Sequence, residues 1–425
     1  MATEIETASV SALCAQAKVA SRLLATLDSG VKDRALEAIA EALDRQAADI
    51  LEANSRDVEA ATEAGLSPAL LDRLELTPER VGAIAADTRR IAALEDPVGE
   101  VLEQRRLANG LSLRKLRVPL GVVAVIYEAR PNVTIDSAAL CLKAGNAVVL
   151  RGSSSAAHSN AVLAEIASGA IASAGLPPGA LSLVAGAGPT ELVELATQSS
   201  TVDLIIPRGG ERLKAALSGV ATVPVIYAAA GNCHVYVDRS ADLDAAAAII
   251  LNAKTQRPGT CNAAETLLVH SDVAPMFLPR ALRELRDAGV ELRVDGRTRA
   301  LAGDLGDALA EASEDDWATE FLALVLAVKV VDSLQEAVEH VNRYGSGHSE
   351  AIVTGLDESV EAFVEGVDAA CVYVNASTRF TDGGEFGMGA EIGNSTQKLH
   401  ARGPIGLREL CTFKYVLEGT GQVRA

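Results

Sequence analysis

The feature that most constrains the fold is a series of short apolar runs, rich in β-branched residues, that alternate with helical patterns. The first run, at 121–127, reads Gly-Val-Val-Ala-Val-Ile-Tyr. Consecutive apolar residues of this kind are typical of a parallel strand that helices cover on both faces. Comparable runs, separated by helical patterns, follow at 147–150, 181–184, 202–206, 223–227, 266–269, 322–331, 351–353 and 370–374. This order predicts βαβ units and therefore an α/β fold.

The length of the chain predicts more than one core. Its 425 residues exceed a single typical domain, and the strand-like runs form two sets, the second of which begins at Val235. We therefore expect two doubly wound α/β domains. Residues 8–94, which precede both sets, are rich in Ala, Leu, Glu and Arg and are predicted to be helical throughout. Within them Thr77 is a predicted N-cap that is followed by Pro78 at the first helical position.

Two further segments predict a small β arm. Residues 107–117 alternate apolar and polar side chains, as in a strand pair with one face in water. The stretch 410–417 is a final strand-like run. Because exposed strand edges pair readily with other strands, such an arm calls for a partner and predicts assembly of the chain into an oligomer.

Charge and cysteine usage argue against several classes of function. The chain has 38 Lys and Arg against 57 Asp and Glu, a formal net charge of −19, which argues against a nucleic-acid partner. The six cysteines have neither metal-ligand spacing nor the density of a disulfide framework, so a reducing compartment fits best. No apolar run reaches the roughly 18 residues of a membrane span, and the N-terminus does not resemble a secretion signal. We expect a cytoplasmic protein without a membrane partner and, because its histidines are scattered, without a metal.

Cys261 is the candidate nucleophile. It follows Gly259 and Thr260 on a connection between a helical pattern and a strand-like run, where a side chain can face a ligand. The small neighbours leave room for an incoming carbonyl carbon, and Lys254 and Arg257 raise the local potential, which favours the thiolate. The alternative is that Cys261 is a small buried hydrophobe, as many cysteines are. The stretch alone leaves both interpretations open.

Two strand-to-helix turns are candidate phosphate-binding sites. In the first, Arg151 and the hydroxyl groups of Ser153 and Ser154 lie at a predicted helix N-terminus, where backbone N–H groups and the helix dipole favour anions. In the second, Gly209 and Gly210 allow a ligand to approach the backbone closely. Neither turn has the full G-x-G-x-x-G fingerprint, and ordinary turn glycines are the alternative. Together the two turns indicate a dinucleotide cofactor.

Longer motifs extend these observations along most of the chain. They are Val-Pro-Leu-Gly-Val at 118–122, Ile-Tyr-Glu-Ala-Arg-Pro-Asn-Val at 126–133, Leu-Lys-Ala-Gly-Asn-Ala-Val-Val-Leu-Arg-Gly at 142–152, Pro-Arg-Gly-Gly at 207–210, Gly-Thr-Cys-Asn at 259–262, Glu-Phe-Gly-Met-Gly-Ala-Glu-Ile-Gly at 385–393 and Lys-Leu-His-Ala-Arg-Gly-Pro at 398–404. These motifs resemble those of the aldehyde dehydrogenase superfamily, and within it the reductases of γ-glutamyl phosphate. The resemblance implies an aldehyde dehydrogenase-like fold.

The resemblance also implies roles for residues that would bind the cofactor. Glu320 stands where a Glu holds the nicotinamide ribose, and Arg151 stands where other members place a Lys near the adenosine ribose. Members that prefer NAD carry an acidic residue shortly after that Lys, whereas this chain has Ser153 and Ser154. A 2′-phosphate fits cationic and hydroxyl side chains better than a carboxylate, so NADPH/NADP is the implied cofactor.

For the reacting groups, the resemblance implies that Cys261 is the catalytic nucleophile. Asn132 is the candidate oxyanion donor, and Arg130 is the alternative at that place. Arg130 and Arg379 are the candidate residues for binding the substrate. No residue is assigned to a metal.

The implied activity is the NADPH-dependent reduction of L-glutamyl 5-phosphate to L-glutamate 5-semialdehyde and phosphate, through a cysteine thioester, in proline biosynthesis. Aldehyde-oxidising members carry Glu-Leu-Gly-Gly, whose Glu activates water, whereas the corresponding stretch at 228–232 is Ala-Ala-Ala-Gly-Asn. A reductase that acts on an acyl phosphate must protect its thioester from water, so the missing base favours reduction. An NAD-dependent aldehyde oxidase, a cysteine hydrolase and an inactive scaffold are the alternatives.

The resemblance finally implies a domain assignment and partners. The expected ranges are 1–104 and 119–236 for a cofactor-binding domain, 237–375 for a catalytic domain, 105–118 and 405–425 for an oligomerisation arm, and 376–404 for a connecting active-site segment. The expected partners are the small-molecule substrate, further copies of the chain in a dimer or tetramer, and, transiently, glutamate 5-kinase.

Overall fold

The computed structural model describes residues 9–227 and 230–424 and divides the chain into two compact units. Unit 1 comprises Met1–Ala228, Gly387–Gly393 and Ile405–Ala425, and unit 2 comprises Ala229–Phe386 and Asn394–Pro404. None of the helices within the described ranges is both long enough and apolar enough to cross a membrane.

The first part of unit 1 is helical, as predicted. Its helices are α1 (Val10–Leu24), α2 (Ser29–Arg45), α3 (Ala47–Glu63), α4 (Pro68–Leu74) and α5 (Pro78–Ala92). The predicted start of α5 is confirmed, because the Thr77 side chain accepts a hydrogen bond from the N–H of Arg80 at 3.3 Å. Such a cap satisfies a backbone donor that has no partner inside the helix.

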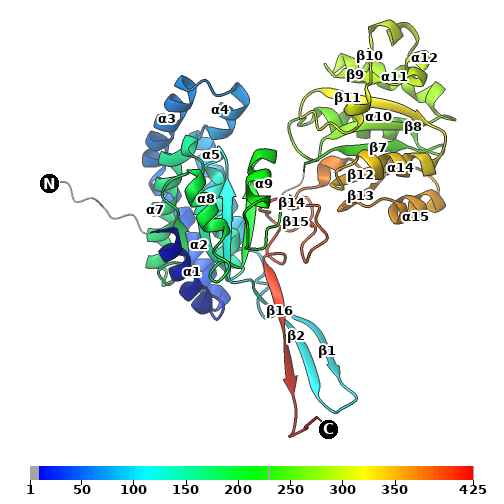
Figure 1. The fold of residues 1–425 in the computed structure, drawn as a ribbon. Helices are drawn as coiled ribbons and strands as arrows, with labels where there is room; N and C mark the ends of the chain where they lie inside the picture. Colours follow the sequence, from blue (N-terminus) through cyan, green and yellow to red (C-terminus); the bar gives the residue numbers. More distant parts are fainter. Residues whose placement is uncertain (1–8, 228–229, 425) are drawn as a thin grey trace. The chain divides into compact units, whose positions relative to one another are not determined.

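A four-stranded parallel sheet forms the centre of unit 1 (Figure 1). Its strands, in spatial order, are β5 (Leu181–Leu183), β4 (Ala147–Arg151), β3 (Val122–Tyr127) and β6 (Leu204–Arg208). All six residues of β3 are buried, as its continuous apolar run predicts. The remaining helices of the unit are α6 (Asn132–Lys143), η1 (Ser154–Ala156), α7 (Ala157–Ser173), α8 (Pro189–Ala196) and α9 (Glu211–Ser218). Helices α1, α6 and α7 contact the sheet, and α2, α3 and α5 contact α6 or α7.

The prediction of a strand at 223–227 is wrong. This segment makes only an isolated bridge between Val225 and Ile205 of β6, not a regular strand. Pro224 has no backbone N–H, so it can only accept a hydrogen bond, which it does from the N–H of Ile205 at 2.9 Å. A proline therefore limits the ladder that an apolar sequence alone would suggest.

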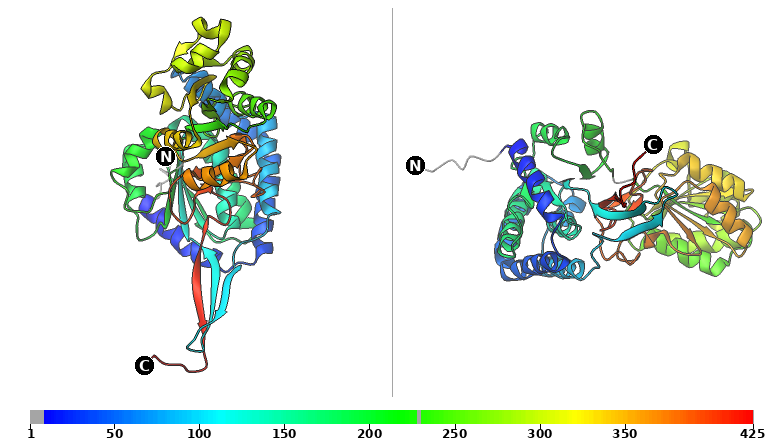
Figure 2. Two further views of the ribbon diagram at one scale, coloured as in Figure 1. Left: turned by 90° about the vertical axis from the view of Figure 1, so that its right-hand side faces the viewer. Right: turned by 90° about the horizontal axis from the view of Figure 1, so that it is seen from below.

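The β arm consists of three antiparallel strands, β1 (Val101–Arg106), β2 (Ser112–Pro119) and β16 (Cys411–Glu418), with β2 in the middle. Two views show the three strands side by side (Figures 1 and 2). The predicted strand pair at 107–117 is displaced, because residues 107–111 form the turn and the first strand lies before them. All six side chains of β1 are exposed. An alternating sequence pattern arises only where one face of a strand is buried, so β1 has no such pattern.

Unit 2 is built on a seven-stranded sheet. Its strands in spatial order are β10 (Ala310–Glu311), β9 (Glu291–Val294), β11 (Val325–Val331), β8 (Ala264–His270), β7 (Cys233–Val237), β12 (Ser349–Val353) and β13 (Cys371–Val374), and all neighbouring pairs are parallel. The helices are α10 (Leu243–Thr255), α11 (Ala274–Asp287), α12 (Gly296–Leu301), η2 (Gly303–Ala308), α13 (Glu314–Trp317), α14 (Leu334–Tyr344), α15 (Asp357–Gly366) and η3 (Thr378–Phe380). Strands β14 (Asn394–Ser395) and β15 (Gly403–Pro404) form a separate pair.

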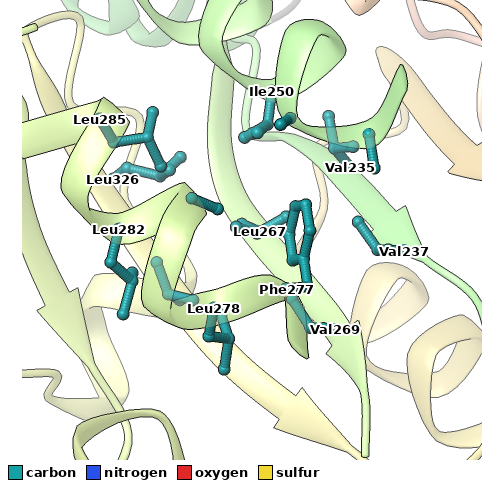
Figure 3. Packing of buried hydrophobic residues seen from close by; sticks show 14 of the residues in the cluster. Val235, Val237, Ile250, Leu267, Val269, Phe277, Leu278, Leu282, Leu285 and Leu326 are labelled. Atoms are coloured by element: carbon teal, nitrogen blue, oxygen red, sulfur yellow. The ribbon is translucent and has the colours of Figure 1, made fainter. Parts of the chain in front are cut away.

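Both faces of this sheet are covered. Val235 and Val237 of β7 belong to a cluster with α10 and α11, in which Phe277 lies among strand residues such as Leu267 (Figure 3). Tyr236, between the two valines, belongs to the opposite cluster with α14 and α15. Successive side chains of a strand point to opposite faces, so the residues of a strand that is covered on both faces are mostly apolar. This confirms the predicted α/β fold class.

The units divide at a different place from the expected domains. The division falls between 228 and 229 instead of 236 and 237, because β7 pairs with β8 and β12 and thus belongs to the second sheet. The expected connecting segment 376–404 is also split, since 387–393 belong to unit 1 and 394–404 to unit 2. Strands β9 and β10 were not predicted.

Candidate active site

The loops around Cys261 gather at one edge of the unit 2 sheet. Cys261 and Glu320 lie on segments that lead into β8 and β11, and Asn232 and Ser346 lie on segments that lead into β7 and β12. Because these strands are parallel, their amino ends lie at the same edge. The candidate nucleophile therefore has loop neighbours that are distant in sequence.

Gly231 lies directly against the Cys261 backbone. A Cβ atom built at Gly231 would lie 1.4 Å from the carbonyl oxygen of Cys261 and 2.6 Å from its Cα atom. The same carbonyl oxygen accepts a hydrogen bond from Sγ of buried Cys233 at 3.2 Å. Residues before β7 thus define the position of the Cys261 loop, which no local pattern around Cys261 indicates.

Glu320 belongs to this same cluster. Its carboxylate accepts a hydrogen bond from the N–H of Gly231 at 2.6 Å. Gly231, which contacts the Cys261 backbone, therefore connects Glu320 with Cys261. Nearby, the main chain of Leu322 adopts a left-handed φ of 53°, and its N–H donates to Oε1 of Glu265 at 3.2 Å. Unit 2 thus brings close together Cys261 and Glu320, two residues to which the family resemblance gives roles in one site.

Lys254 forms a buried salt bridge with Glu265. Its ammonium lies 2.5 Å from Oε2 of Glu265, and both side chains are fully buried. Burial lowers the pKa of Lys254 and raises the pKa of Glu265 to about 7, although Lys254 itself acts in the opposite direction. The expectation that Lys254 raises the potential at Cys261 is therefore weakened, because Glu265 offsets its charge.

Arg379, a predicted substrate residue, lies beside the Cys261 loop. Its guanidinium donates to the Thr260 hydroxyl at 2.9 Å and to the Gln256 side chain at 2.8 Å. Burial lowers the pKa of this half-buried side chain, and neighbouring Arg257 adds to the effect. A partly desolvated cation next to the candidate nucleophile is suited to an anionic substrate group.

In unit 1, the candidate cofactor residues lie at the carboxyl edge of the parallel sheet. Arg151 ends β4, and Gly209 and Gly210 follow β6. The Arg151 side chain is buried, and its terminal nitrogen donates to the carbonyl oxygens of Ala187 and Gly188 at 2.6 and 2.9 Å. Its Nε atom is buried without a hydrogen-bond partner in the part of the chain that the structure describes. A buried donor of this kind fits an anionic ligand at the edge where nucleotides bind α/β sheets.

Two carboxylates near Arg151 were missed from the sequence. Oε2 of Glu128 accepts the N–H of Gly210 at 3.3 Å, and a Cβ atom at Gly209 would lie 2.7 Å from the same oxygen. Glu191 likewise lies against the turn before α8, since a Cβ atom at Gly188 would be 2.7 Å from its Oε2. Both carboxylates oppose the effect of burial, which lowers the pKa of Arg151. The missing Cβ of Gly209 thus makes room for Glu128.

The serine hydroxyls hold the neighbouring turn. Oγ of Ser153 accepts the N–H of Ala129 at 3.1 Å and lies 2.7 Å from Oγ of Ser155, whereas the Ser154 side chain is exposed. Ala129 has a φ of 37°, a strained value for a residue with a Cβ atom. The strained turn fixes the path of the chain into Arg130.

Asn132 begins helix α6, and its amide donates to Oδ2 of Asp136 at 2.8 Å. Burial raises the pKa of Asp136 to about 7, against the effect of the Asn132 hydrogen bond. This bond uses one of the two N–H groups of Asn132. Asn132 and Arg130 belong to unit 1 and Cys261 to unit 2, so their roles at Cys261 stay predictions.

Within 9–227 and 230–424, no group of three or more His, Cys, Asp or Glu side chains is placed to hold a metal ion.

Comparisons with known proteins cover nearly the whole chain. The model of the aldehyde dehydrogenase family matches residues 2–300 and 310–416. A gamma-glutamyl phosphate reductase of Thermobifida fusca is 54% identical over 96% of this chain and 97% of the relative, and one of Moorella thermoacetica is equally similar with the same coverage. The crystal structure of gamma-glutamyl phosphate reductase from Thermotoga maritima matches with a TM-score of 0.95 and 44% identity, covering 98% of this chain and 100% of the other. An acetylating aldehyde dehydrogenase from Geobacillus thermoglucosidasius, at 19% identity and a TM-score of 0.68 over 98% of this chain and 97% of the other, shares the fold.

Proposed function

This chain belongs to the aldehyde dehydrogenase family, and we propose that it reduces L-glutamyl 5-phosphate with NADPH to L-glutamate 5-semialdehyde and phosphate, in proline biosynthesis. Membership of the family makes it an oxidoreductase that uses a nicotinamide cofactor. One observation carries the finer proposal: the chain matches gamma-glutamyl phosphate reductases along nearly its whole length at 54% identity.

In the proposed reaction the Cys261 thiolate attacks the γ-carbonyl carbon. Addition of Sγ to this carbon gives a tetrahedral oxyanion, which collapses by breaking the bond to the phosphate oxygen and leaves a thioester and inorganic phosphate. The backbone N–H of Cys261 and the amide of Asn132 are the proposed donors to the tetrahedral oxyanion. When bound, NADPH supplies hydride, and Glu320 is the proposed partner of its nicotinamide ribose. The resulting thiohemiacetal oxyanion expels the Cys261 thiolate and releases the aldehyde without a proton donor.

Reduction also fits the segment before β7. Ala228 and Ala229, where a water-activating Glu would be expected in an aldehyde oxidase, lie outside the described residues, but neither has an ionisable side chain. Gly231 instead uses its N–H to hold Glu320. Without a Glu in this segment to activate water, the thioester is hydrolysed more slowly and can accept hydride.

The function is tested in the reverse direction. Purified enzyme is mixed with L-glutamate 5-semialdehyde, NADP and phosphate, and the absorbance of NADPH is followed at about 340 nm, a wavelength set by the nicotinamide chemistry. We expect turnover that requires phosphate, because phosphate must attack the thioester to complete the cycle. Turnover at an equal rate without phosphate would indicate an aldehyde oxidase and contradict the proposal.

The same assay tests the cofactor. Buried Nε of Arg151 and the Ser153 and Ser154 hydroxyls support a 2′-phosphate at the end of β4, whereas Glu191 is the feature that favours NAD. We expect Arg151→Gln to lower kcat/KM with NADP by at least about tenfold relative to NAD, since a charge-assisted hydrogen bond would be lost.

Glu191→Gln is the matched control of opposite sign. It removes a negative charge near Arg151, so the preference for NADP should rise. General loosening of the turn would instead reduce catalysis with both cofactors alike. If neither substitution changes the ratio of kcat/KM with NADP to kcat/KM with NAD, the 2′-phosphate binds elsewhere. If the wild type prefers NAD, Glu191 is assigned to the ribose 2′-OH.

We also propose that the β arm joins copies of this chain in a dimer or tetramer. Phe413, Tyr415 and Leu417 alternate along β16 and are 44, 54 and 52% exposed, which puts an apolar row on one face of the arm. Light scattering should give a smaller mass for Tyr415→Asp than for Lys414→Asp, which changes the other face. Equal masses for both variants and the wild type would reject the arm as the interface. Transient contact with glutamate 5-kinase stays a prediction.

A further inference from the structure

A pocket of about 500 Å³ lies at the same sheet edge as Cys261, wholly within unit 2. Its lining comes from the end of α14, the turn before β12, β12 itself, the segment before β13 and the segment between β14 and β15. The lining includes Gly345, Ser346, Glu350, Asp368, Lys398 and Arg402. None of them has a role in the chemistry described above.

The pocket carries an excess cation on one side. Lys398 and Arg402 both bind the carboxylate of Asp368, at 2.5 and 2.8 Å. These two cations hold the pKa of Asp368 below its ordinary value. Two positive charges against one leave a net charge of +1, and buried Nε of Arg402 has no hydrogen-bond partner within the described ranges. A carboxylate is the simplest ligand that satisfies both conditions.

The pocket carries a buried carboxyl group on another side; burial raises the pKa of Glu350, and neighbouring His234 acts in the opposite direction. Glu350 is fully buried, and its Oε2 accepts the backbone N–H of His234 at 2.7 Å and lies 2.9 Å from Nδ1 of the same residue. Its other oxygen, Oε1, has no hydrogen-bond partner among the residues that the structure describes. A Cβ atom at Gly345 would lie 2.9 Å from Oε1, so glycine leaves this oxygen less covered than any other residue would. A buried carboxylate oxygen without a donor suits an ammonium ligand.

A short chain of contacts connects the pocket with Cys261. Gly231 touches the Cys261 backbone, and the next residue, Asn232, donates its N–H to Oγ of Ser346 at 3.0 Å. Ser346 lines the pocket. Because adjacent Cα atoms are about 3.8 Å apart, the pocket wall begins near the nucleophile. Two methylene groups separate the reacting carbonyl of a glutamyl group from its α-carbon, which is a similarly short span.

We propose that this pocket binds the amino-acid end of the glutamyl substrate, with the α-carboxylate at Lys398 and Arg402 and the α-ammonium at Glu350. The proposal rests on the proposed function and adds to it the residues that select the substrate. Arg379, beside Thr260, then stays available for the phosphate that leaves the γ-carbonyl carbon when Cys261 attacks it. The lining matches a zwitterion better than a simple aldehyde, which offers no charge to either side of the pocket.

The test compares three aldehydes in the reverse assay with phosphate and NADP. They are L-glutamate 5-semialdehyde, 5-oxopentanoate, which lacks the ammonium, and 4-aminobutanal, which lacks the carboxylate. For Lys398→Gln and Arg402→Gln we expect discrimination against 4-aminobutanal to fall at least about tenfold, while discrimination against 5-oxopentanoate stays the same. Glu350→Gln should give the reverse pattern. A purely structural role would lower kcat/KM for all three aldehydes together.

Arg297→Gln is the matched control, because Arg297 is an exposed cation of unit 2 that binds Asp332. Lys398 is 67% exposed, so its substitution keeps the test valid even if the buried Glu350→Gln variant fails to fold. Wild-type turnover with unchanged discrimination in Lys398→Gln and Arg402→Gln would overturn this proposal and leave the proposed function intact. A wild type without phosphate-dependent turnover of L-glutamate 5-semialdehyde would overturn both.

Discussion

Replacement of Cys261 by serine is expected to lower turnover at least about 10³-fold, because a serine hydroxyl is a far weaker nucleophile than a thiolate and is a poorer leaving group from the reduced adduct. The loss should appear in kcat with phosphate, NADP and L-glutamate 5-semialdehyde. NADP binding, measured by calorimetry, should stay near the wild-type value, since the proposed cofactor residues Arg151, Ser153 and Ser154 are unchanged.

The proposed covalent step can be tested separately from turnover. Incubation of the wild type with L-glutamyl 5-phosphate in the absence of NADPH should add one glutamyl group to the protein mass, and Cys261→Ser should show no such addition. Cys14→Ala is the control, because burial raises the pKa of the Cys14 thiol to about 11 and keeps it protonated. Near-normal turnover of Cys261→Ser would return Cys261 to the interpretation of a buried structural residue.

The second large effect is expected from Gly231→Ala, although alanine adds only one methyl group. That methyl carbon would lie 1.4 Å from the Cys261 carbonyl oxygen, so the Cys261 loop or the segment before β7 must move. We expect kcat/KM to fall at least about 100-fold, because catalysis is sensitive to displacements near 1 Å. Overpacking should also reduce the free energy of unfolding, by about 1–3 kcal/mol.

Gly296→Ala provides the matched control within unit 2. A Cβ atom at Gly296 meets nothing within 4 Å, and the residue begins α12, where alanine is compatible with the helix. Its activity and melting temperature should be close to the wild-type values. Wild-type kcat/KM in Gly231→Ala would mean that the Cys261 loop relaxes without loss, and would contradict its close packing.

The sequence by itself determined the elements whose burial is regular. Strand β3 was predicted because all six of its residues are buried and apolar, and helix α5 because Thr77 and Pro78 carry a local start signal. The motif around Cys261 indicated the family for the same reason, since its residues are neighbours in the chain. Each of these signals depends on consecutive residues or on a fixed period.

Only the tertiary structure decided the features that depend on pairing between distant segments. Strand β1 was missed because all of its side chains are exposed, and 223–227 was predicted as a strand although Pro224 interrupts its ladder. Glu320 accepts a hydrogen bond from Gly231, which is 89 positions away. Glu128 occupies the turn at Gly210, which was predicted to be open to phosphate. The pocket at Glu350 and Lys398 is assembled from separate loops in the same way. Local patterns record which side chains are buried, whereas the partner of a charge is set by strand order and loop path.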